Sequence, residues 1–311
     1  MPDALYLIPG VLAAALGGEF FVRGTVGGAT RARIAPGIIA ATVAAFATSS
    51  PELSVAINSA TAGSPEIALG DVLGSNVANV GFVLAIAILF GGLTARREDM
   101  RRDVPVALGA PVVIFALGRD GVIDRADAVV LLALFASWLT WAVVQASRER
   151  SARAADPEAR SMTQVLRDGA VGLGLLILAG RLIVWAAADF GRLLGWDTFT
   201  VGAVLVAVAT SAPELATVVA ARVRGHDDVS VGTVLGSNIF NGLLIIGVAA
   251  AIHPIMVPRA ESTVAIGFGL LTILMLFPGR SGRLPASRGI LLLATFAAYL
   301  WTAVAVHAGA G

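Results

Sequence analysis

The chain contains no cysteine, and every one of its 22 basic residues is arginine. The absence of cysteine excludes disulfides, thiolate metal sites and cysteine nucleophiles. The absence of lysine excludes Schiff-base chemistry and a lysine-bearing phosphate loop. Charged residues of both signs are also scarce, at 14% of 311 residues, whereas 57% of the residues are hydrophobic. Soluble proteins average about 25% charged residues, so the composition places this chain in a membrane.

Ten apolar stretches follow one another along the chain. A helix needs about 20 mostly apolar residues to cross a bilayer, and ten crossings leave no room for a separate soluble domain. The stretches lie near residues 4–22, 36–60, 66–92, 104–118, 126–146, 163–188, 199–221, 228–252, 262–277 and 289–307. They predict an all-α, polytopic membrane protein with ten transmembrane helices.

Arginine is distributed unevenly over the loops between these stretches. The loops that follow the first, third, fifth, seventh and ninth stretches hold 17 of the 22 arginines. Cytoplasmic loops collect positive charge. The sequence therefore predicts a protein of the cell membrane, either inner or plasma membrane, with both chain ends outside and a polar connector at 147–162 in the cytoplasm.

One segment of the chain recurs at an offset of 162 residues. Residues 48–79 and 210–241 are identical at 13 of 32 positions without gaps, and the identities include Thr, Ser, Pro, Glu, Gly and Asn. Polar residues duplicated at membrane depth are hard to explain by packing alone, because they are costly there.

The offset spans five helices, an odd number, so the second copy must cross the membrane in the opposite direction. The sequence thus predicts two inverted five-helix repeats, residues 1–146 and 163–311, joined by the connector 147–162. Their signature segments are 45–79 and 207–241. Inverted repeats occur in many secondary transporters, whose binding sites lie near the membrane midplane where the repeats meet.

Each copy of the repeat places a carboxylate inside an apolar stretch. Thr48 and Glu52 are four residues apart and share one helix face, as do Thr210 and Glu214. A charged side chain at the centre of a membrane helix costs about 2.5–3.5 kcal/mol on insertion scales. Each glutamate is therefore expected to face protein, water or a cation.

A proline precedes each glutamate. Pro51 and Pro213 lack the N–H group that would bond the carbonyl four residues back, which is that of Ala47 or Ala209. We expect both helices to bend here and these carbonyls to become free oxygen ligands.

The motif GSNxxN adds a polar edge to the next helix of each copy. Ser75 and Asn79 are four residues apart, and so are Ser237 and Asn241. Small residues four apart permit close helix approach. Such pairs are Gly70 with Gly74 and Gly232 with Gly236.

Two such hairpins facing each other would bring carboxylates, hydroxyls, amides and carbonyls to one place. Oxygen-only ligands suit hard cations: Ca²⁺ takes about six to eight oxygens at flexible distances, whereas Mg²⁺ demands an octahedron and retains its water. Two glutamates neutralise one divalent cation, and the same carboxylates could instead hold monovalent cations or protons.

At these residues the chain resembles the cation/Ca²⁺ exchanger superfamily, and within it bacterial Na⁺/Ca²⁺ antiporters. That family carries paired signatures of the form GTSxPE and GxxxGSNxxN in two inverted halves of five helices. The resemblance is close over both signature segments and looser over the whole ten-helix plan.

The resemblance implies a set of ion ligands. Glu52 and Glu214 match the central carboxylates, and Asn79 and Asn241 match the positions that close the middle of the site. The other implied ligands are hydroxyl or carbonyl groups of Thr48 and Thr210, the hydroxyls of Ser75 and Ser237, and the carbonyls of Ala45 and Ala207. Ser49, Ser211, Pro51 and Pro213 are expected to support the site.

Two positions depart from the family pattern, and one acidic residue has no acidic counterpart in the other repeat. The glycine of GTS is Ala47 or Ala209 here, a small change expected to preserve close packing. Some relatives carry Asp where this chain has Asn241, so the middle of this site holds two carboxylates, which leaves the stoichiometry and the counter-ion open. Asp71 pairs with Thr233 in the repeat, and three readings fit it: a structural hydrogen bond or helix contact, modulation of the site, or a misplaced span.

The favoured function is secondary exchange of Ca²⁺ for Na⁺ by alternating access around a midplane site with two glutamates. Exchange of Ca²⁺ or another divalent cation for H⁺ is the alternative, because a buried glutamate binds protons readily, and a passive cation channel is a third possibility. An enzyme is not expected, because no nucleophile–base pair, zinc motif or phosphate loop is present. The expected partners are the transported ions and the lipid bilayer, with no cofactor, nucleic acid or protein partner.

Overall fold

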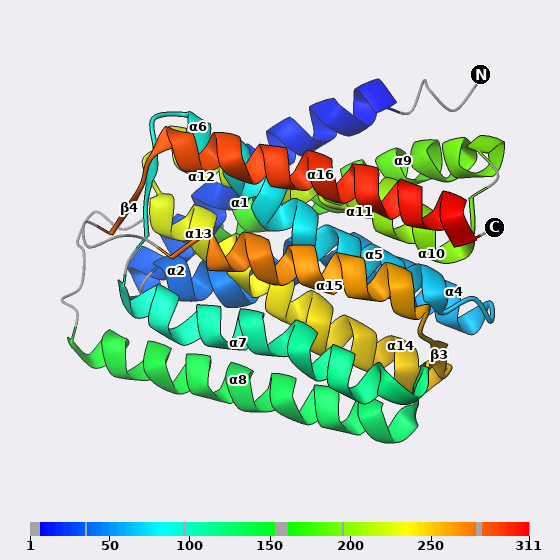
Figure 1. Ribbon diagram of the computed structural model, residues 1–311. Helices are drawn as coiled ribbons and strands as arrows, with labels where there is room; N and C mark the ends of the chain where they lie inside the picture. The colour runs from blue at the N-terminus through cyan, green and yellow to red at the C-terminus, as the bar shows by residue number, and fades with distance from the viewer. Residues whose placement is uncertain are drawn as a thin grey trace.

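The computed structural model describes residues 7–34, 36–95, 97–152, 161–194, 196–277 and 282–310. These residues form a bundle of long helices with four strands of two residues each (Figure 1). The fold is therefore all-α, as the composition predicts. Part of the predicted connector, residues 153–160, lies outside the described residues, and so do both chain ends.

Six of the helices run without interruption, and several of them form the outer layer of the bundle. They are α1 (Leu7–Ala32), α7 (Arg97–Leu117), α8 (Arg125–Ala152), α9 (Met162–Leu194), α15 (Arg259–Leu274) and α16 (Ala286–Ala310). Apolar windows on α8, α9 and α16 are only 22–28% buried within the protein. Apolar side chains on these helices therefore face outward, as expected for helices in contact with lipid.

Four further rods are interrupted, and each contains a π-helical turn. The first is α2 (Pro36–Ile39), η2 (Ala40–Ala44), α3 (Ala45–Thr48) and α4 (Ser50–Thr61); the second is α5 (Glu66–Ala78), η3 (Asn79–Leu84) and α6 (Ala85–Leu89). Their counterparts are α10 (Thr198–Thr200), η5 (Val201–Val206), α11 (Ala207–Thr210) and α12 (Ala212–Val223), and α13 (Asp227–Ile239), η6 (Phe240–Ile245) and α14 (Ile246–Ile252). The α5–α6 and α13–α14 rods are 83% and 78% buried, so they form the centre of the bundle. Turns of π-helix are rare and occur frequently at functional sites.

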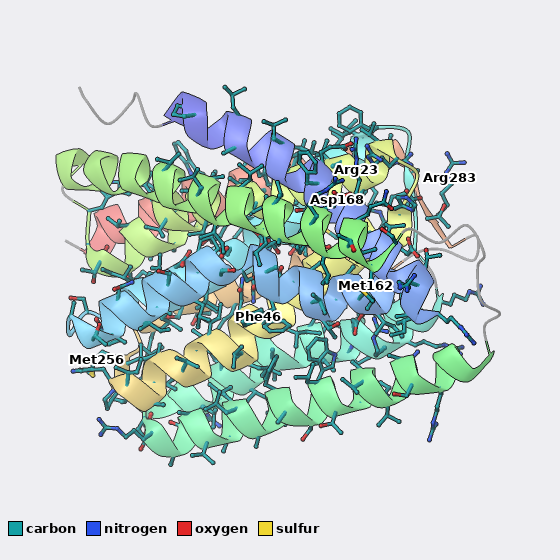
Figure 2. All side chains as sticks on the ribbon, turned by 180° about the vertical axis from the view of Figure 1, so that it is seen from behind. Arg23, Phe46, Met162, Asp168, Met256 and Arg283 are labelled. Atoms are coloured by element: carbon teal, nitrogen blue, oxygen red, sulfur yellow. The ribbon has the colours of Figure 1, made fainter. Side chains whose placement is uncertain are left out.

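Two short antiparallel ribbons join loops at the two ends of the bundle. β1 (Leu93–Thr94) pairs with β4 (Arg283–Leu284), and β2 (Val122–Ile123) pairs with β3 (Ile255–Met256). A single 3₁₀ turn, η4 (Gly118–Asp120), precedes β2. Figure 2 shows Arg23, Met162 and Arg283 at one end and Met256 at the other. We call these the basic end and the opposite end; the separation agrees with the alternation of arginine over the loops.

The two central rods cross the bundle in opposite directions. α6 leads into β1 at the basic end, and α13 begins beside that strand, where the backbone N–H of Thr94 donates to the Asp227 carboxylate at 2.8 Å. α14 then leads to β3 at the opposite end (Figure 1). The signature helices that contain the repeated GSNxxN motif are thus antiparallel, as expected if the halves are inverted.

Not every predicted span is long and apolar enough to cross a membrane by itself. Among the described residues six helices meet that condition, or seven when the bent pair Gly37–Thr48 and Ser50–Thr61 counts as one span. α15, for example, has only 16 residues, and the count of ten spans stays a prediction.

Glycine allows the central rods to touch backbone to backbone. A Cβ atom added at Gly232 of α13 would lie 2.6 Å from the carbonyl oxygen of Gly37 in α2. At Gly74 and Gly236 the facing oxygens, those of Ala203 and Ala41, are closer still. The predicted small-residue contacts are therefore present, and they allow α5 to pack closely against η5 and α13 against η2.

Candidate cation site

A group of polar side chains is buried where the interrupted rods meet. Each of these residues is at most 2% exposed: Thr48, Ser49, Glu52, Asp71, Ser75, Asn79, Thr210, Ser211, Glu214, Ser237 and Asn241. They come from α3, α4, α5 and η3 of one half of the sequence and from α11, α12, α13 and η6 of the other. The structure thus brings the polar residues of both signature segments into one buried region.

The two prolines lie where a new helix segment begins. The helices break at Ser49 and Ser211, and Pro51 and Pro213 occupy the first turns of α4 and α12. Each glutamate therefore lies in the first turn of a helix, where free N–H groups and the helix dipole stabilise negative charge. The interior of a continuous helix has no free N–H groups, so the break is what stabilises the negative charge of each glutamate.

The predicted bends and free carbonyls are only partly correct. Within the described residues, the break at Ser49 bends the chain by 44°, and the break at Ser211 does not exceed 40°. The carbonyl of Ala47 accepts a hydrogen bond from the Ser50 hydroxyl. It is therefore not a free ligand, because a neighbouring side chain replaces the N–H that Pro51 lacks.

Glu214 is held by hydroxyl groups from both halves of the sequence. Its Oε1 atom accepts from the Ser49 hydroxyl at 3.1 Å and from the Ser237 hydroxyl at 3.2 Å. The Thr48 hydroxyl lies 3.5 Å from that of Ser237. The Oε2 atom is buried and has no hydrogen-bond partner among the described residues. One oxygen of Glu214 is thus fixed, and the other is available to a cation.

Glu52 has a different environment from Glu214. Neither of its carboxylate oxygens has a hydrogen-bond partner in the described part of the chain. The hydroxyls of Ser75 and Thr210, which lie nearby, donate to Asp71 Oδ1 at 3.3 and 3.1 Å. The three carboxylates are close enough for Glu214 and Asp71 to repel the charge on Glu52. A buried carboxylate without a donor is costly unless a cation or a proton neutralises it.

The predicted carbonyl ligands lie beside these hydroxyls. The Ala45 carbonyl accepts from the Thr48 hydroxyl at 3.3 Å. The Ser75 and Thr210 hydroxyls each lie 3.3 Å from the Ala207 carbonyl, so this carbonyl and Asp71 share the single proton of each, and the Ser211 hydroxyl donates to the same carbonyl at 2.7 Å. Both carbonyls therefore belong to the same polar region, and the Ser211 hydroxyl faces Ala207 rather than Glu52.

Four asparagines form a cross-link between the two central rods. Asn76 and Asn238 each donate to the other's backbone carbonyl, at 3.3 and 3.1 Å. Asn79 donates to the side chain of Asn238 at 3.0 Å, and Asn241 donates to that of Asn76 at 3.1 Å. The side-chain oxygens of Asn79 and Asn241 have no partner among the described residues. These two oxygens are free to bind a cation, and the other two asparagines orient them.

Asn76 and Asn238 were not among the predicted site residues. The signal was present, since both copies of GSNxxN have this asparagine as their third residue. The spacing within one helix could not show that each asparagine pairs with the opposite copy, because that contact depends on how the rods cross.

The region contains hydroxyl, amide, backbone carbonyl and carboxylate oxygens. Uncharged hydroxyl, amide and backbone oxygens surround carboxylates, which is the ligand type that hard cations prefer. Among the described residues no three acidic or histidine side chains converge as a single metal cluster.

Fold and site together define a polytopic membrane transporter that exchanges cations. The chain belongs to the sodium/calcium exchanger protein family, which it matches over residues 3–144 and 169–305. The matched ranges include both signature segments, so the family assignment rests on the same residues that form the site.

Individual relatives agree with this family. The chain is 32% identical to the inner membrane protein YrbG of Escherichia coli over 71% of each chain. It is 27% identical to the putative antiporter CaxA of Alkalimonas amylolytica, over 95% of this chain and 96% of that one. Among solved structures it resembles the sodium–calcium exchanger NCX_Mj of Methanococcus jannaschii, determined after soaking with Na⁺ and Sr²⁺, with a TM-score of 0.79 and 26% identity over 94% of this chain and 96% of that chain.

Proposed function

We propose that this protein exchanges Ca²⁺ for Na⁺ across the membrane by alternating access around Glu52 and Glu214. The observation that carries the proposal is the buried pair of carboxylates with three oxygens that lack a hydrogen-bond partner among the described residues: both oxygens of Glu52 and Oε2 of Glu214. The free side-chain oxygens of Asn79 and Asn241 complete the set. Relatives described as a sodium/calcium exchanger and a putative antiporter support the same assignment.

Coupling between Ca²⁺ and Na⁺ transport follows from the free-energy cost of the empty, negatively charged site. Two uncompensated carboxylates at membrane depth cost about 5–7 kcal/mol on insertion scales, at roughly 2.5–3.5 kcal/mol each. A conformational change of the empty, doubly negative site is disfavoured by that amount, whereas one Ca²⁺ or two Na⁺ neutralise the charge. The protein therefore changes sides when loaded, and this makes it an exchanger rather than a channel.

The proposed architecture is two inverted repeats, residues 1–146 and 163–311, in which each repeat supplies one glutamate. The opposite directions of α5–α6 and α13–α14 support this division. The ten-helix count, with the basic end in the cytoplasm and both chain ends outside, belongs to the same proposal. Orientation is testable because the chain has no native cysteine.

The orientation test uses single-cysteine variants at exposed positions near the two ends. Met162→Cys lies at the start of α9 at the basic end, and Ala126→Cys lies near the start of α8 at the opposite end. In intact cells a membrane-impermeant maleimide should label the variant at 126 only, and disruption of the cells should expose the variant at 162. The reverse pattern would contradict the proposed orientation.

Proteoliposome transport tests the coupling. Vesicles loaded with Na⁺ and diluted into Na⁺-free buffer with radioactive Ca²⁺ at equal pH on both sides should accumulate Ca²⁺. Accumulation driven only by a pH gradient would favour the alternative, Ca²⁺/H⁺ exchange, and dissipative flux that ignores both gradients would favour a channel. The Glu52→Gln and Glu214→Gln variants should insert normally and transport nothing, since each retains the shape of the side chain and loses its charge.

A further inference from the structure

A third carboxylate, that of Asp71, is buried beside the two glutamates. Asp71 lies on α5 and is 0% exposed. Its Oδ1 atom accepts from Ser75 and Thr210, and its Oδ2 atom is buried with no hydrogen-bond partner among the described residues. An acid that served only to bond two hydroxyls would need no second free oxygen, and a neutral asparagine could accept the same two bonds.

Asp71 breaks the symmetry of the site. At an offset of 162 residues its counterpart is Thr233, which is uncharged and buried, and whose hydroxyl also lacks a partner among the described residues. Near Thr233 the site contains one carboxylate, Glu214, which takes the hydroxyl of Ser237. Near Asp71 the equivalent hydroxyl, that of Ser75, lies 3.3 Å from Asp71 Oδ1 and also 3.3 Å from the Ala207 carbonyl, and among the described residues it makes no hydrogen bond to Glu52. One flank of the site therefore has two carboxylates and the other has one.

We propose that Asp71 is a direct ligand of a monovalent cation. It adds an anionic oxygen to Ser75, Thr210 and the Ala207 carbonyl, which the family resemblance already implies as ligands. This inference rests on the proposed function and adds a third negative charge to its site. Among the described residues no three acidic side chains converge as one metal cluster, so the ion proposed at Asp71 is distinct from the one proposed between the glutamates.

With Asp71 as a third negative ligand, the number of Na⁺ ions in the site follows from charge neutrality. Two glutamates alone leave that number open. Three carboxylates are neutralised by three monovalent cations, so a fully Na⁺-loaded site carries no net charge. One Ca²⁺ neutralises two of them and leaves Asp71 to retain a monovalent ion. Since the cost of moving charge across the bilayer favours neutral states, Asp71 should govern Na⁺ binding far more than Ca²⁺ binding.

The test compares cation binding to the purified protein, measured as stabilisation against heat in Na⁺ and Ca²⁺ titrations. Asp71→Asn should weaken Na⁺ binding by about tenfold or more, lower the Hill coefficient for Na⁺, and change Ca²⁺ affinity by less than about threefold. The matched control is Ser59→Ala, since Ser59 is a buried serine of α4 whose hydroxyl bonds only within its own helix, to Ala56. It should change neither affinity.

A double variant that relocates the charge distinguishes a direct role of the Asp71 carboxylate from a structural effect of its loss. The double variant Asp71→Thr with Thr233→Asp moves the carboxylate to the counterpart position, and it should recover Na⁺ binding that Asp71→Thr alone loses. Unchanged Na⁺ affinity in Asp71→Asn, or equal losses of Na⁺ and Ca²⁺ affinity without recovery in the double variant, would overturn the role of Asp71. Loss of Ca²⁺ binding in Glu52→Gln tests the proposed function separately, because its outcome does not depend on Asp71.

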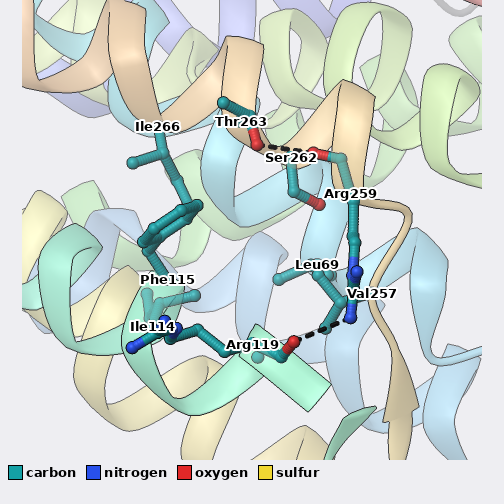
Figure 3. A pocket seen from close by; sticks show the side chains of 10 residues that line it. Leu69, Ile114, Phe115, Arg119, Val257, Arg259, Ser262, Thr263 and Ile266 are labelled. Carbon is teal, nitrogen blue, oxygen red and sulfur yellow. Dashed lines mark hydrogen bonds between the residues drawn. The ribbon is translucent and has the colours of Figure 1, made fainter. Parts of the chain in front are cut away.

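A second, independent inference concerns a cavity of about 320 Å³ at the opposite end, between α5, α7 and α15 (Figure 3). Arg119 and Arg259 line it, and none of its ten lining residues is acidic. Arg259 is held in place by a hydrogen bond to the backbone carbonyl of Arg119 at 2.8 Å. Ser262 also lines the cavity; it is 3% exposed, and its hydroxyl has no partner among the described residues. Phe115, at 50% exposure, forms part of an apolar wall.

We infer that this cavity binds a phosphate-bearing anion. Arginine is the preferred partner of phosphate because its N–H groups can donate two parallel bonds, and the Ser262 hydroxyl supplies a further donor. The volume lies at the lower end of the range for ligand pockets, about 300–1,000 Å³, so it fits a headgroup rather than a whole lipid. A phospholipid headgroup with its first methylenes along Phe115, and free phosphate, share this chemistry.

The experiment measures stabilisation of the purified protein by three probes: phosphatidylglycerol in mixed micelles, phosphatidylcholine as the zwitterionic control, and inorganic phosphate. Stabilisation by phosphatidylglycerol alone identifies a lipid headgroup, and stabilisation by inorganic phosphate identifies a free anion. Arg119→Gln should weaken either effect by about tenfold, and it retains the backbone carbonyl that positions Arg259. No stabilisation by any phosphate probe, or the same stabilisation in Arg119→Gln, would overturn the inference.

Discussion

Gly202 provides the most quantitative test of how the site is positioned. This residue lies in η5, and a Cβ atom added to it would lie 2.5 Å from the carbonyl oxygen of Ile67 and 2.9 Å from the backbone nitrogen of Asp71. Both neighbours are backbone atoms of α5, so no side chain can turn aside. Ordinary contact begins about 1 Å farther out, and α5 and η5 must separate by roughly that amount in Gly202→Ala.

The expected loss follows from this displacement. Overpacking of a dense core costs about 1–3 kcal/mol, and if the loaded site bears that cost, Ca²⁺ affinity falls about 5- to 150-fold. The assay is Ca²⁺ uptake into Na⁺-loaded proteoliposomes, with half-saturation measured on protein that elutes as a single folded species. Gly267→Ala is the matched control, because a Cβ atom there meets nothing within 4 Å. Equal half-saturation in the two variants would refute the close contact between α5 and η5 as a determinant of the site.

Three further variants test separate contacts. Ser49→Ala removes a donor to Glu214 and should weaken Ca²⁺ affinity about tenfold, since a hydrogen bond to a charged group contributes about 1.5–3 kcal/mol; an unchanged affinity would contradict the assigned contact. Asp103→Asn removes the carboxylate bound to the buried Arg102 guanidinium and should lower the free energy of unfolding by about 3–5 kcal/mol, seen as a fall in the melting temperature in detergent while any folded protein keeps its Ca²⁺ affinity. Asn238→Ala should lower stability by about 1–2 kcal/mol, at roughly 0.6 kcal/mol for each interhelical hydrogen bond lost, and reduce the transport rate; wild-type values of both would mean that the asparagine cross-link is dispensable.

The sequence predicted those features of the site that follow from spacing within one helix or from duplication of a motif. The paired Glu52 and Glu214, the antiparallel signature helices and the close approach at Gly232 all follow from residue identities repeated at one offset. A duplicated carboxylate within an apolar stretch has few structural explanations, and a duplicated glycine pair predicts a helix contact directly.

Features that depend on the tertiary crossing could not be predicted in this way. The π-helical turns change how far a side chain such as Asn79 is rotated around its helix, and no residue pattern encodes them. The Thr210 hydroxyl of α11 donates to Asp71 of α5 at 3.1 Å, a contact between separate helices that no spacing within one helix predicts. The Ala47 carbonyl was expected to be free because Pro51 lacks a donor, and a serine hydroxyl one residue earlier takes its place.

Diffraction from crystals soaked in Ca²⁺ tests the central claim most directly. The account predicts one Ca²⁺ peak within about 2.3–2.6 Å of carboxylate oxygens from both Glu52 and Glu214, and no such peak in crystals of Glu52→Gln. A Ca²⁺ ion bound elsewhere in the protein, or one that contacts neither glutamate, would contradict it.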